Sequence, residues 1–365
     1  MTTTILLYVA ILVASSAATW FGSVRLERSA GFLSRHYGLP PLVHGTLVVA
    51  VASSLPELTT VVASALIHGD FELGMASIVG SAIFNILVIP GLSALVDGRA
   101  LSAELRLVYR DAQFYLTSVA VLLLTFSFAL IYAPVTGADL TGSLTRRSAM
   151  VPLLLYGLYL FLQQQEVQDE RGRRNGGGKA PNGAARSGPG SAQRRDGRRF
   201  QLVAKAWLML VVGIGLVIAG VDGLLRVAIG LGDALGTPSF LWGATVVAAA
   251  TSVPDAIISL RGARRGDGDL SIGNVLGSNV FDLLVAIPAG VLIAGAAVVD
   301  YRVAAPLMAF LTLATVVLFT FLRTSLELSR AEGWVLLTLY AAFVVWLALE
   351  TTGVTMVLGR VGPSG

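Results

Sequence analysis

The chain has 365 residues, of which 55% are apolar and only 13% are charged, with a formal net charge of +4 and no cysteine. Soluble domains carry about 25% charged residues, so this composition excludes a soluble globular protein and predicts an all-α polytopic membrane protein. The lack of cysteine excludes disulfides and thiolate metal sites. Most basic residues lie in predicted loops, where they report orientation in a membrane rather than binding to nucleic acid.

The first part of the chain contains five apolar segments long enough to cross a bilayer, which takes about 20 residues. They are residues 4–22, 41–66, 73–96, 112–133 and 148–164. The first segment has no basic region before it, so we expect a retained span rather than a signal peptide.

The second and third of these spans carry polar groups that are costly in a membrane. Pro56 and Glu57 end the string ASSLPE, and Asn85 ends the string ASIVGSAIFN. Proline removes one backbone N–H and clashes with the preceding turn, so we expect the helix to kink at Pro56 and to free the carbonyl of Ala52. Freed carbonyls are tolerated within a membrane where they line a cavity or coordinate an ion.

A polar segment, residues 165–200, follows the fifth span and is rich in Gly, Arg, Ser and Pro. Such a composition cannot bury enough apolar surface to offset its chain entropy, so we expect a disordered linker. It separates a first unit, residues 1–164, from a second unit, residues 201–365.

The second unit again contains five apolar segments, at residues 202–225, 239–260, 270–296, 303–322 and 334–351. Its second and third spans repeat the polar strings as ATSVPD and GNVLGSNVFD, so that residues 243–290 match residues 45–91. The alignment places Glu57 opposite Asp255 and Asn85 opposite Asp282. We call these two matching regions the first and second copies of the motif.

Basic residues gather in the linker and in the loops after the first, third, seventh and ninth spans. The positive-inside rule therefore predicts a cytoplasmic linker and an N-terminus outside the cell. Because each unit holds an odd number of spans, the second unit enters the membrane in the opposite orientation. Ten spans in two inverted-topology repeats are typical of transporters whose site lies between the repeats at the midplane.

The polar groups of the two copies offer only oxygen atoms. Glu57, Asp255 and Asp282 supply carboxylates and Asn85 supplies an amide, a set that suits hard cations such as Ca²⁺ better than Zn²⁺ or Cu⁺. Even by low estimates, one charge at the centre of a bilayer costs about 3 kcal/mol. We therefore expect mobile cations to balance a charge of up to −3, as three Na⁺ would do fully and one Ca²⁺ nearly so, without a cofactor.

At these residues the chain resembles the cation/calcium exchanger superfamily, and more narrowly the prokaryotic type of its sodium/calcium exchanger branch. The resemblance implies a monomeric antiporter of the cell membrane that exchanges Na⁺ for Ca²⁺ by alternating access, with spans 1 and 6 moving across the others. It also implies a central cation cage of Glu57, Asn85, Asp255 and Asp282. The flanking ion positions that it implies are lined by Ser53, Ser54, Ser81, Thr251, Ser252, Ser278 and the carbonyls of Ala50 and Ala248.

The sequence also departs from the family pattern. Ala52 and Ala250 replace glycines, Ala76-Ser77 replaces a Gly-Asn pair, and Ala82 replaces an asparagine. Because Asp255 and Asp282 also resemble the potassium-dependent exchangers, the choice of ions stays open at this point. Coupling to H⁺ or K⁺, another divalent substrate, or a passive channel are the alternatives, although Ser81 and Ser278 argue against the proton exchangers.

An enzyme is a remote alternative. Gly230-Leu231-Gly232-Asp233 matches the GxGD signature of intramembrane aspartyl proteases, which need a second aspartate within reach. No Tyr-Asp pair precedes it, and Asp233 is expected in an outer loop, so we predict that the chain is not an enzyme. His68 is likewise expected in an outer loop, with its side chain exposed.

Overall fold

The computed structural model describes residues 2–38, 50–96, 100–102, 104–105, 107–175 and 192–351. The start of the first motif copy, residues 45–49, and the middle of the predicted linker, residues 176–191, lie outside the described residues. The first unit contains α1 (Thr2–His36), α2 (Ala50–Ser53), α3 (Leu55–Leu66), α4 (Phe71–Leu95), β1 (Leu101–Ser102), the π-helix η3 (Leu107–Asp111), α5 (Ala112–Tyr132), β2 (Thr141–Thr145) and α6 (Arg146–Asn175).

The second unit follows the same order with more interruptions. It contains α7 (Ala192–Leu235), α8 (Ser239–Trp242), the π-helix η4 (Gly243–Val247), α9 (Ala248–Thr251), α10 (Val253–Arg264), α11 (Gly268–Phe281), the π-helix η5 (Asp282–Ala286), α12 (Ile287–Ala294), β3 (Ala296–Asp300), α13 (Tyr301–Ser325), β4 (Glu327–Leu328) and α14 (Arg330–Thr351).

The predicted helical membrane fold is confirmed. In the described part of the chain, seven helices are long and apolar enough to cross a membrane, and the bent segment from α8 to α10 adds an eighth. α3 and α6 occupy the two remaining predicted spans, but α3 has only 12 residues and α6 is not among the seven.

Several predicted boundaries are wrong. α1 runs to His36 instead of ending near residue 22, and α7 runs to Leu235, so Asp233 lies in its last turn rather than in a loop. Helices α6 and α7 also extend into both ends of the predicted disordered linker, at residues 165–175 and 192–200. These ends are rich in Gln, Glu and Arg, which favour helix even where no apolar face exists.

The sequence did not reveal the two small antiparallel sheets at the ends of the bundle. β1 pairs with β4, and β2 pairs with β3 in a register that sets Thr141 opposite Asp300. Each sheet joins a loop of the first unit to a loop of the second.

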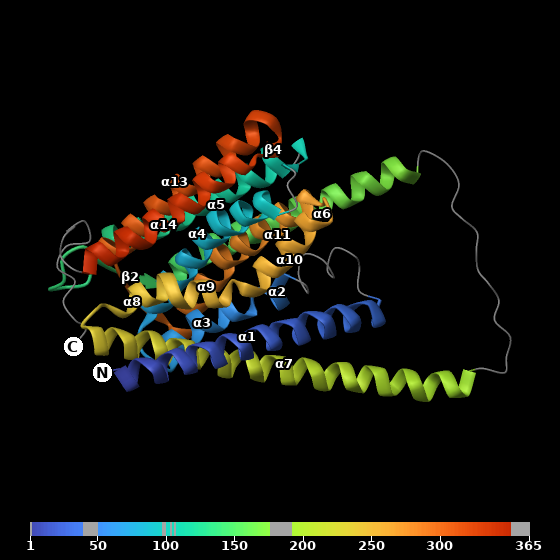
Figure 1. Cartoon of the computed structure of the whole chain (residues 1–365), viewed down its shortest axis with the longest axis horizontal. Coiled ribbons are helices and arrows are strands. Elements are labelled where there is room, and N and C mark those ends of the chain that lie inside the picture. Colours follow the sequence, from blue (N-terminus) through green and yellow to red (C-terminus); the bar gives the residue numbers. More distant parts are fainter. Residues whose placement is uncertain are drawn as a thin grey trace.

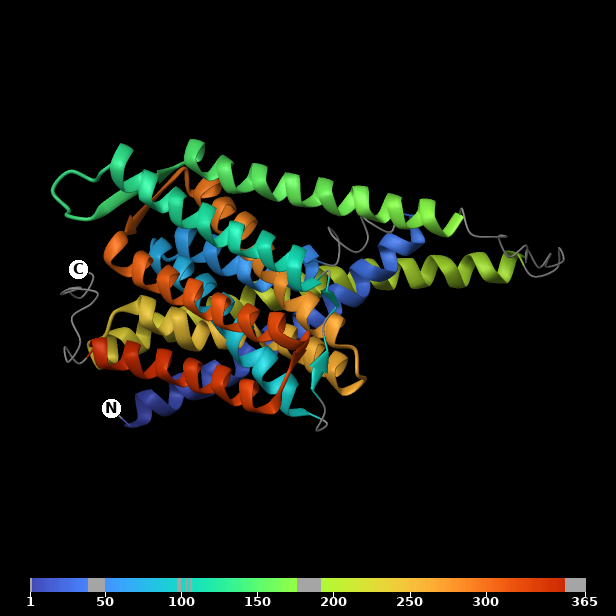
Figure 2. The ribbon, with the colours of Figure 1, turned by 90° about the horizontal axis from the view of Figure 1, so that it is seen from above.

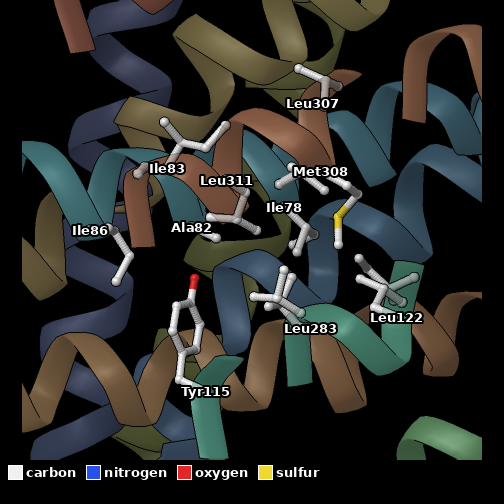
Figure 3. Packing of buried hydrophobic residues seen from close by; sticks show 14 of the residues in the cluster. Ile78, Ala82, Ile83, Ile86, Tyr115, Leu122, Leu283, Leu307, Met308 and Leu311 are labelled. Atoms are coloured by element: carbon white, nitrogen blue, oxygen red, sulfur yellow. The ribbon is translucent and has the colours of Figure 1, made fainter. Parts of the chain in front are cut away.

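The helices differ in how deeply they are buried. α4 lies at the centre, with 78% of its apolar stretch buried, and packs against α3, α10, α13 and α14, whereas α1 is only 17% buried. Residues of α4, α5, η5 and α13 meet in a continuous apolar core (Figure 3). α1 and α7 pack chiefly on each other and lie side by side along one edge of the bundle (Figure 1), and Figure 2 shows α6 and α7 projecting beyond its end.

Candidate ion-binding site

Both copies of the motif break their helix where the sequence predicted. Ser54 separates α2 from α3, and Ser252 separates α9 from α10, with a bend of 48° at the second break. In each case the proline occupies the first turn of the new helix, where its missing N–H has no helical partner to lose. Glu57 and Asp255 therefore lie in the first turns of α3 and α10, where the helix dipole favours a negative charge.

The other two central residues lie on the helices that face these breaks. Asn85 is in the continuous helix α4, one turn after Ser81. Asp282 begins the π-helix η5, one turn after Ser278. Such π-helical insertions occur frequently at functional sites because they change the direction of a side chain within a helix.

The residues predicted for the cation cage are buried together inside the bundle. Asn85 and Asp282 have no exposed surface, and Glu57 and Asp255 are 2% and 3% exposed. The predicted flanking residues Ser54, Ser81, Thr251, Ser252, Ser278 and Ala248 are buried as well. Ser53 is partly buried at the end of α2, and Ala50 and Ala248 begin the short helices α2 and α9 that precede the two breaks.

Side chains from the two copies contact each other directly. The hydroxyls of Ser81 and Ser252 are 2.7 Å apart, and the amide nitrogen of Asn85 donates to Oδ1 of Asn279 over 3.0 Å. Within the second copy, Asn274 donates to Oδ1 of Asp255 over 3.4 Å. The structure thus brings both copies to one place, while the role of these residues as ion ligands stays a prediction.

Oxygen atoms without hydrogen-bond partners concentrate at this place. Seven buried side-chain N or O atoms of the described residues have no partner, and six of them belong to the motif copies. The six are Ser54 Oγ, Glu57 Oε2, Ser77 Oγ, Asn85 Oδ1 and both carboxylate oxygens of Asp282. An unpaired buried polar atom costs about 1–3 kcal/mol, so such a cluster calls for a ligand that accepts electron pairs.

The electrostatics also favour a cation. Glu57 lies near enough to Asp282 and Asp255 to interact with both charges, and in the described part of the chain no Lys or Arg pairs with any of the three. No three acidic or histidine side chains among the described residues converge closely enough to hold a metal by themselves. An ion here must therefore also be bound by amide, hydroxyl or backbone oxygens.

Sequence reasoning missed two sets of contacts. Asn274 forms a hydrogen bond to Asp255, and Asn279 forms one to Asn85. The sequence hinted at these roles only through a mismatch, because the first copy has Ser77 and Ala82 at the matching positions. His68 lies in the loop between α3 and α4, but the expectation of an exposed side chain is wrong: the side chain is only 11% exposed, and its Nε2 lies 3.0 Å from Oδ1 of Asp222 in α7. Its partner follows 154 positions later, so no local pattern could indicate the contact.

Comparison with known proteins places these residues in a family context. The family model described as sodium/calcium exchanger protein matches residues 4–164 and 205–349. The chain is 28% identical to the inner membrane protein YrbG of Escherichia coli over 94% of this chain and 97% of that protein. It is 27% identical to the sodium/calcium exchanger MaX1 of Methanosarcina acetivorans over 89% and 94% of the two chains.

Two solved structures share the fold. The sodium-calcium exchanger NCX_Mj, soaked with Na⁺ and Ca²⁺, superposes with a TM-score of 0.53 at 25% identity over 93% of this chain and 98% of that one. The H⁺/Ca²⁺ exchanger CAX superposes with a TM-score of 0.68 at 15% identity over 95% of this chain and 85% of that one.

Proposed function

Since the chain belongs to the sodium/calcium exchanger protein family, we propose that it is a Na⁺-coupled Ca²⁺ antiporter working by alternating access. Proteins of this family are membrane transporters rather than enzymes, so the GxGD match is set aside. The observation that carries the proposal is the cluster of buried, unpartnered oxygens between two broken helices.

We further propose ten spans in two inverted repeats, in a monomer of the cell membrane with the N-terminus outside. Packing of α1 against α7 supports the inversion. A Cβ atom on Gly22 would lie 2.8 Å from the carbonyl oxygen of Gly213, and one on Gly220 would lie 2.8 Å from that of Ser15. The two contacts are related by a shift of 198 positions, the same shift that relates Glu57 to Asp255.

The small sheets fit the same inversion. β1 follows the third predicted span and pairs with β4, which follows the ninth, while β2 follows the fourth and pairs with β3, which follows the eighth. Exchanging the two units therefore turns one sheet into the other, as a two-fold axis in the membrane plane requires.

The site's charge explains why two kinds of ion would compete for it. Ionised Glu57, Asp255 and Asp282 give a charge of −3, which several Na⁺ or one Ca²⁺ can balance. Ca²⁺ takes six to eight oxygens in flexible geometry, which the carboxylates, Asn85 and the serine hydroxyls can supply together. Because binding either cation relieves the same repulsion, occupancy by one excludes the other, and this is the requirement for exchange.

The coupling ion is the finer part of the proposal. Sequence similarity to MaX1 over nearly the whole chain favours Na⁺, while the likeness to CAX at 15% identity concerns the fold alone. Ser81 and Ser278 also support Na⁺, because the proton exchangers resembled by this fold have an acid at that position of the motif. Coupling to H⁺ or K⁺ is the alternative.

Transport by purified protein in liposomes tests the proposal. Uptake of ⁴⁵Ca²⁺ should follow an outward Na⁺ gradient and should be lost in Glu57→Gln and Asp255→Asn, because each removes one charge from the site. Asp233→Asn is the matched control, since this acid is exposed at the end of α7 and should leave uptake unchanged. Uptake that persists in both site variants contradicts the site assignment.

The same liposomes identify the coupling ion. Replacing internal Na⁺ by choline while imposing a pH gradient should abolish uptake if Na⁺ is required. Uptake driven by the pH gradient alone would instead establish proton coupling, and a requirement for internal K⁺ would place the chain with the potassium-dependent exchangers.

A further inference from the structure

Asn279 lies at the contact between the two copies, outside the predicted set of ion ligands. It has no exposed surface. Its Nδ2 donates to the carbonyl of Ala82 in α4 and to the hydroxyl of Tyr115 in α5, each over 3.2 Å, and its Oδ1 accepts from Nδ2 of Asn85 over 3.0 Å. Figure 3 shows the Tyr115 hydroxyl directed toward Ala82 among the apolar residues of the core.

These contacts determine which way the Asn279 amide points. Turning it over would set its oxygen against the carbonyl of Ala82 and its NH₂ against the NH₂ of Asn85, replacing two hydrogen bonds by two repulsive contacts. The Ala82 carbonyl belongs to the backbone and can only accept. A fixed backbone acceptor therefore orients Asn279, which in turn orients Asn85.

The orientation of Asn85 matters because its amide has one end that attracts a cation and one that repels it. With Nδ2 bound to Asn279, its Oδ1 is the end left buried without a partner, as are Glu57 Oε2 and both Asp282 oxygens. We propose that Asn279 is a positioning residue that holds the Asn85 oxygen toward the transported cation. This inference rests on the proposed function and adds a determinant of affinity to it.

The same reasoning accounts for the unmatched residue at position 82. Asn279 of the second copy supports Asn85 of the first, so the inverted arrangement would set residue 82 to support Asp282. A carboxylate presents oxygen whichever way it turns and needs no such support. The copy-to-copy difference between Ala82 and Asn279 therefore follows from the difference between Asp282 and Asn85, since only Asn85 needs an orienting partner.

Equilibrium ⁴⁵Ca²⁺ binding and Na⁺-driven ⁴⁵Ca²⁺ uptake by the purified full chain test the proposal. Asn279→Leu keeps the branching of the side chain, although it is bulkier, and removes the acceptor, so the Ca²⁺ concentration for half-saturation should rise about five- to tenfold, the size of one lost hydrogen bond. The maximal uptake rate should stay within about twofold of the wild type. Asn279→Asp keeps an acceptor for Asn85, and its carboxyl, when protonated in this buried position, still donates to the carbonyl of Ala82, so this variant should bind Ca²⁺ about as tightly as the wild type.

A double-mutant cycle separates positioning from a general packing effect. In an Asn85→Asp background both ends of the residue at position 85 are oxygen, so Asn279→Leu should change half-saturation by less than about twofold. If Asn279→Leu fails to fold, Asn279→Ser is used instead. The serine side chain is too short to form hydrogen bonds with both Ala82 and Asn85.

Three outcomes would overturn the inference. They are equal losses of affinity in Asn279→Leu and Asn279→Asp, the same penalty with Asn85 and with Asp at position 85, or a fall in maximal rate at unchanged affinity. If instead the wild-type chain neither binds nor transports Ca²⁺, the proposed function fails first, and with it the premise of the inference.

Discussion

In the first copy of the motif Asn85 lies within an unbroken helix of 25 residues, α4, whereas in the second copy Asp282 starts the π-helix η5 between α11 and α12. The residues next to these positions also differ between the copies. Asn274 donates to Asp255, while Ser77 at the matching position has no partner among the described residues. Each copy thus contains a broken helix, but the residues around the break differ between the copies.

This difference shows that two copies of one motif need not give a symmetric arrangement of side chains. Two identical copies would give either two amides or two carboxylates at positions 85 and 282. One of each gives the four central residues an odd total charge, and it places the amide of Asn85 where Asn279 can orient it. Each difference between the copies in a proposed ligand is accompanied by a difference in the residue that forms a hydrogen bond to it.

Exchanging the charges at positions 85 and 282 should break this comparison most strongly. Asp282→Asn removes a carboxylate whose two oxygens are both buried and unpartnered. The loss should be about 3 kcal/mol or more, which is at least about a hundredfold weaker Ca²⁺ binding. Asn85→Asp should keep Ca²⁺ binding, because a carboxylate still presents oxygen. Equilibrium ⁴⁵Ca²⁺ binding measures both.

Equal losses in these two variants would show that the copies supply interchangeable ligands. The double variant, which restores the charge of −3 with its positions reversed, is the control. It should remain weaker than the wild type, because at position 282 the new amide has no partner equivalent to Asn279.

The equivalent glycines Gly80 and Gly277 sharpen the comparison at the level of stability. A Cβ atom on Gly80 would collide with the backbone of Ala244 in η4, whereas one on Gly277 meets no atom of the described residues within 4 Å. Gly80→Ala should cost about 1–3 kcal/mol through overpacking of two backbones. Gly277→Ala should cost less than about 0.5 kcal/mol, since it only adds a methyl group to open space.

Thermal unfolding in detergent, followed by fluorescence, measures this pair. The melting temperature should fall by several degrees for Gly80→Ala and should hardly change for Gly277→Ala. Equal falls would mean that the first copy packs on Gly277 through the part of the chain outside the described residues, and that the two copies are packed symmetrically.

Local sequence patterns were enough to predict the helix breaks and the side chains of the candidate site. They were not enough to predict the residues that form hydrogen bonds to those side chains. A proline followed by an acidic residue predicted the helix break in both copies, because proline disrupts the helical turn next to it. The copies' similarity predicted that Glu57, Asn85, Asp255 and Asp282 lie together. The Asn85–Asn279 contact joins residues 194 positions apart, and it depends on how α4 and α11 are set against each other, which no periodicity reports.

The same limit applies to boundaries and to the edges of the fold. Helix ends in polar sequence depend on weak propensities, so α1, α6 and α7 run past the predicted limits. The two small sheets pair loops from different units, and their short strands carry no pattern of their own. In each case the outcome depends on contacts with segments that are distant in the sequence, which local patterns do not report.

The contact between His68 and Asp222 tests whether the asymmetry extends to the packing of α1 and α7. A shift of 198 positions places Gly266 and Val24 at the corresponding points. Neither has a polar side chain, so the His68–Asp222 contact between the end of α3 and α7 has no counterpart at these two positions. Asp222→Asn should weaken the contact of α7 with His68 by about 0.5–1 kcal/mol, because a neutral amide oxygen accepts a hydrogen bond more weakly than a carboxylate does. Because the native chain has no cysteine, a single cysteine introduced as Leu55→Cys can be labelled with maleimide. This position packs against an apolar cluster that α7 shares with α3, α4, η4 and α9. Labelling should become about two- to fivefold faster in Asp222→Asn, as α7 leaves α3 more often. Val24→Asn, the matched change in α1, should leave the rate unaltered because Gly266 has no side chain to pair with it. Equal acceleration by both variants would show that α1 and α7 are held alike.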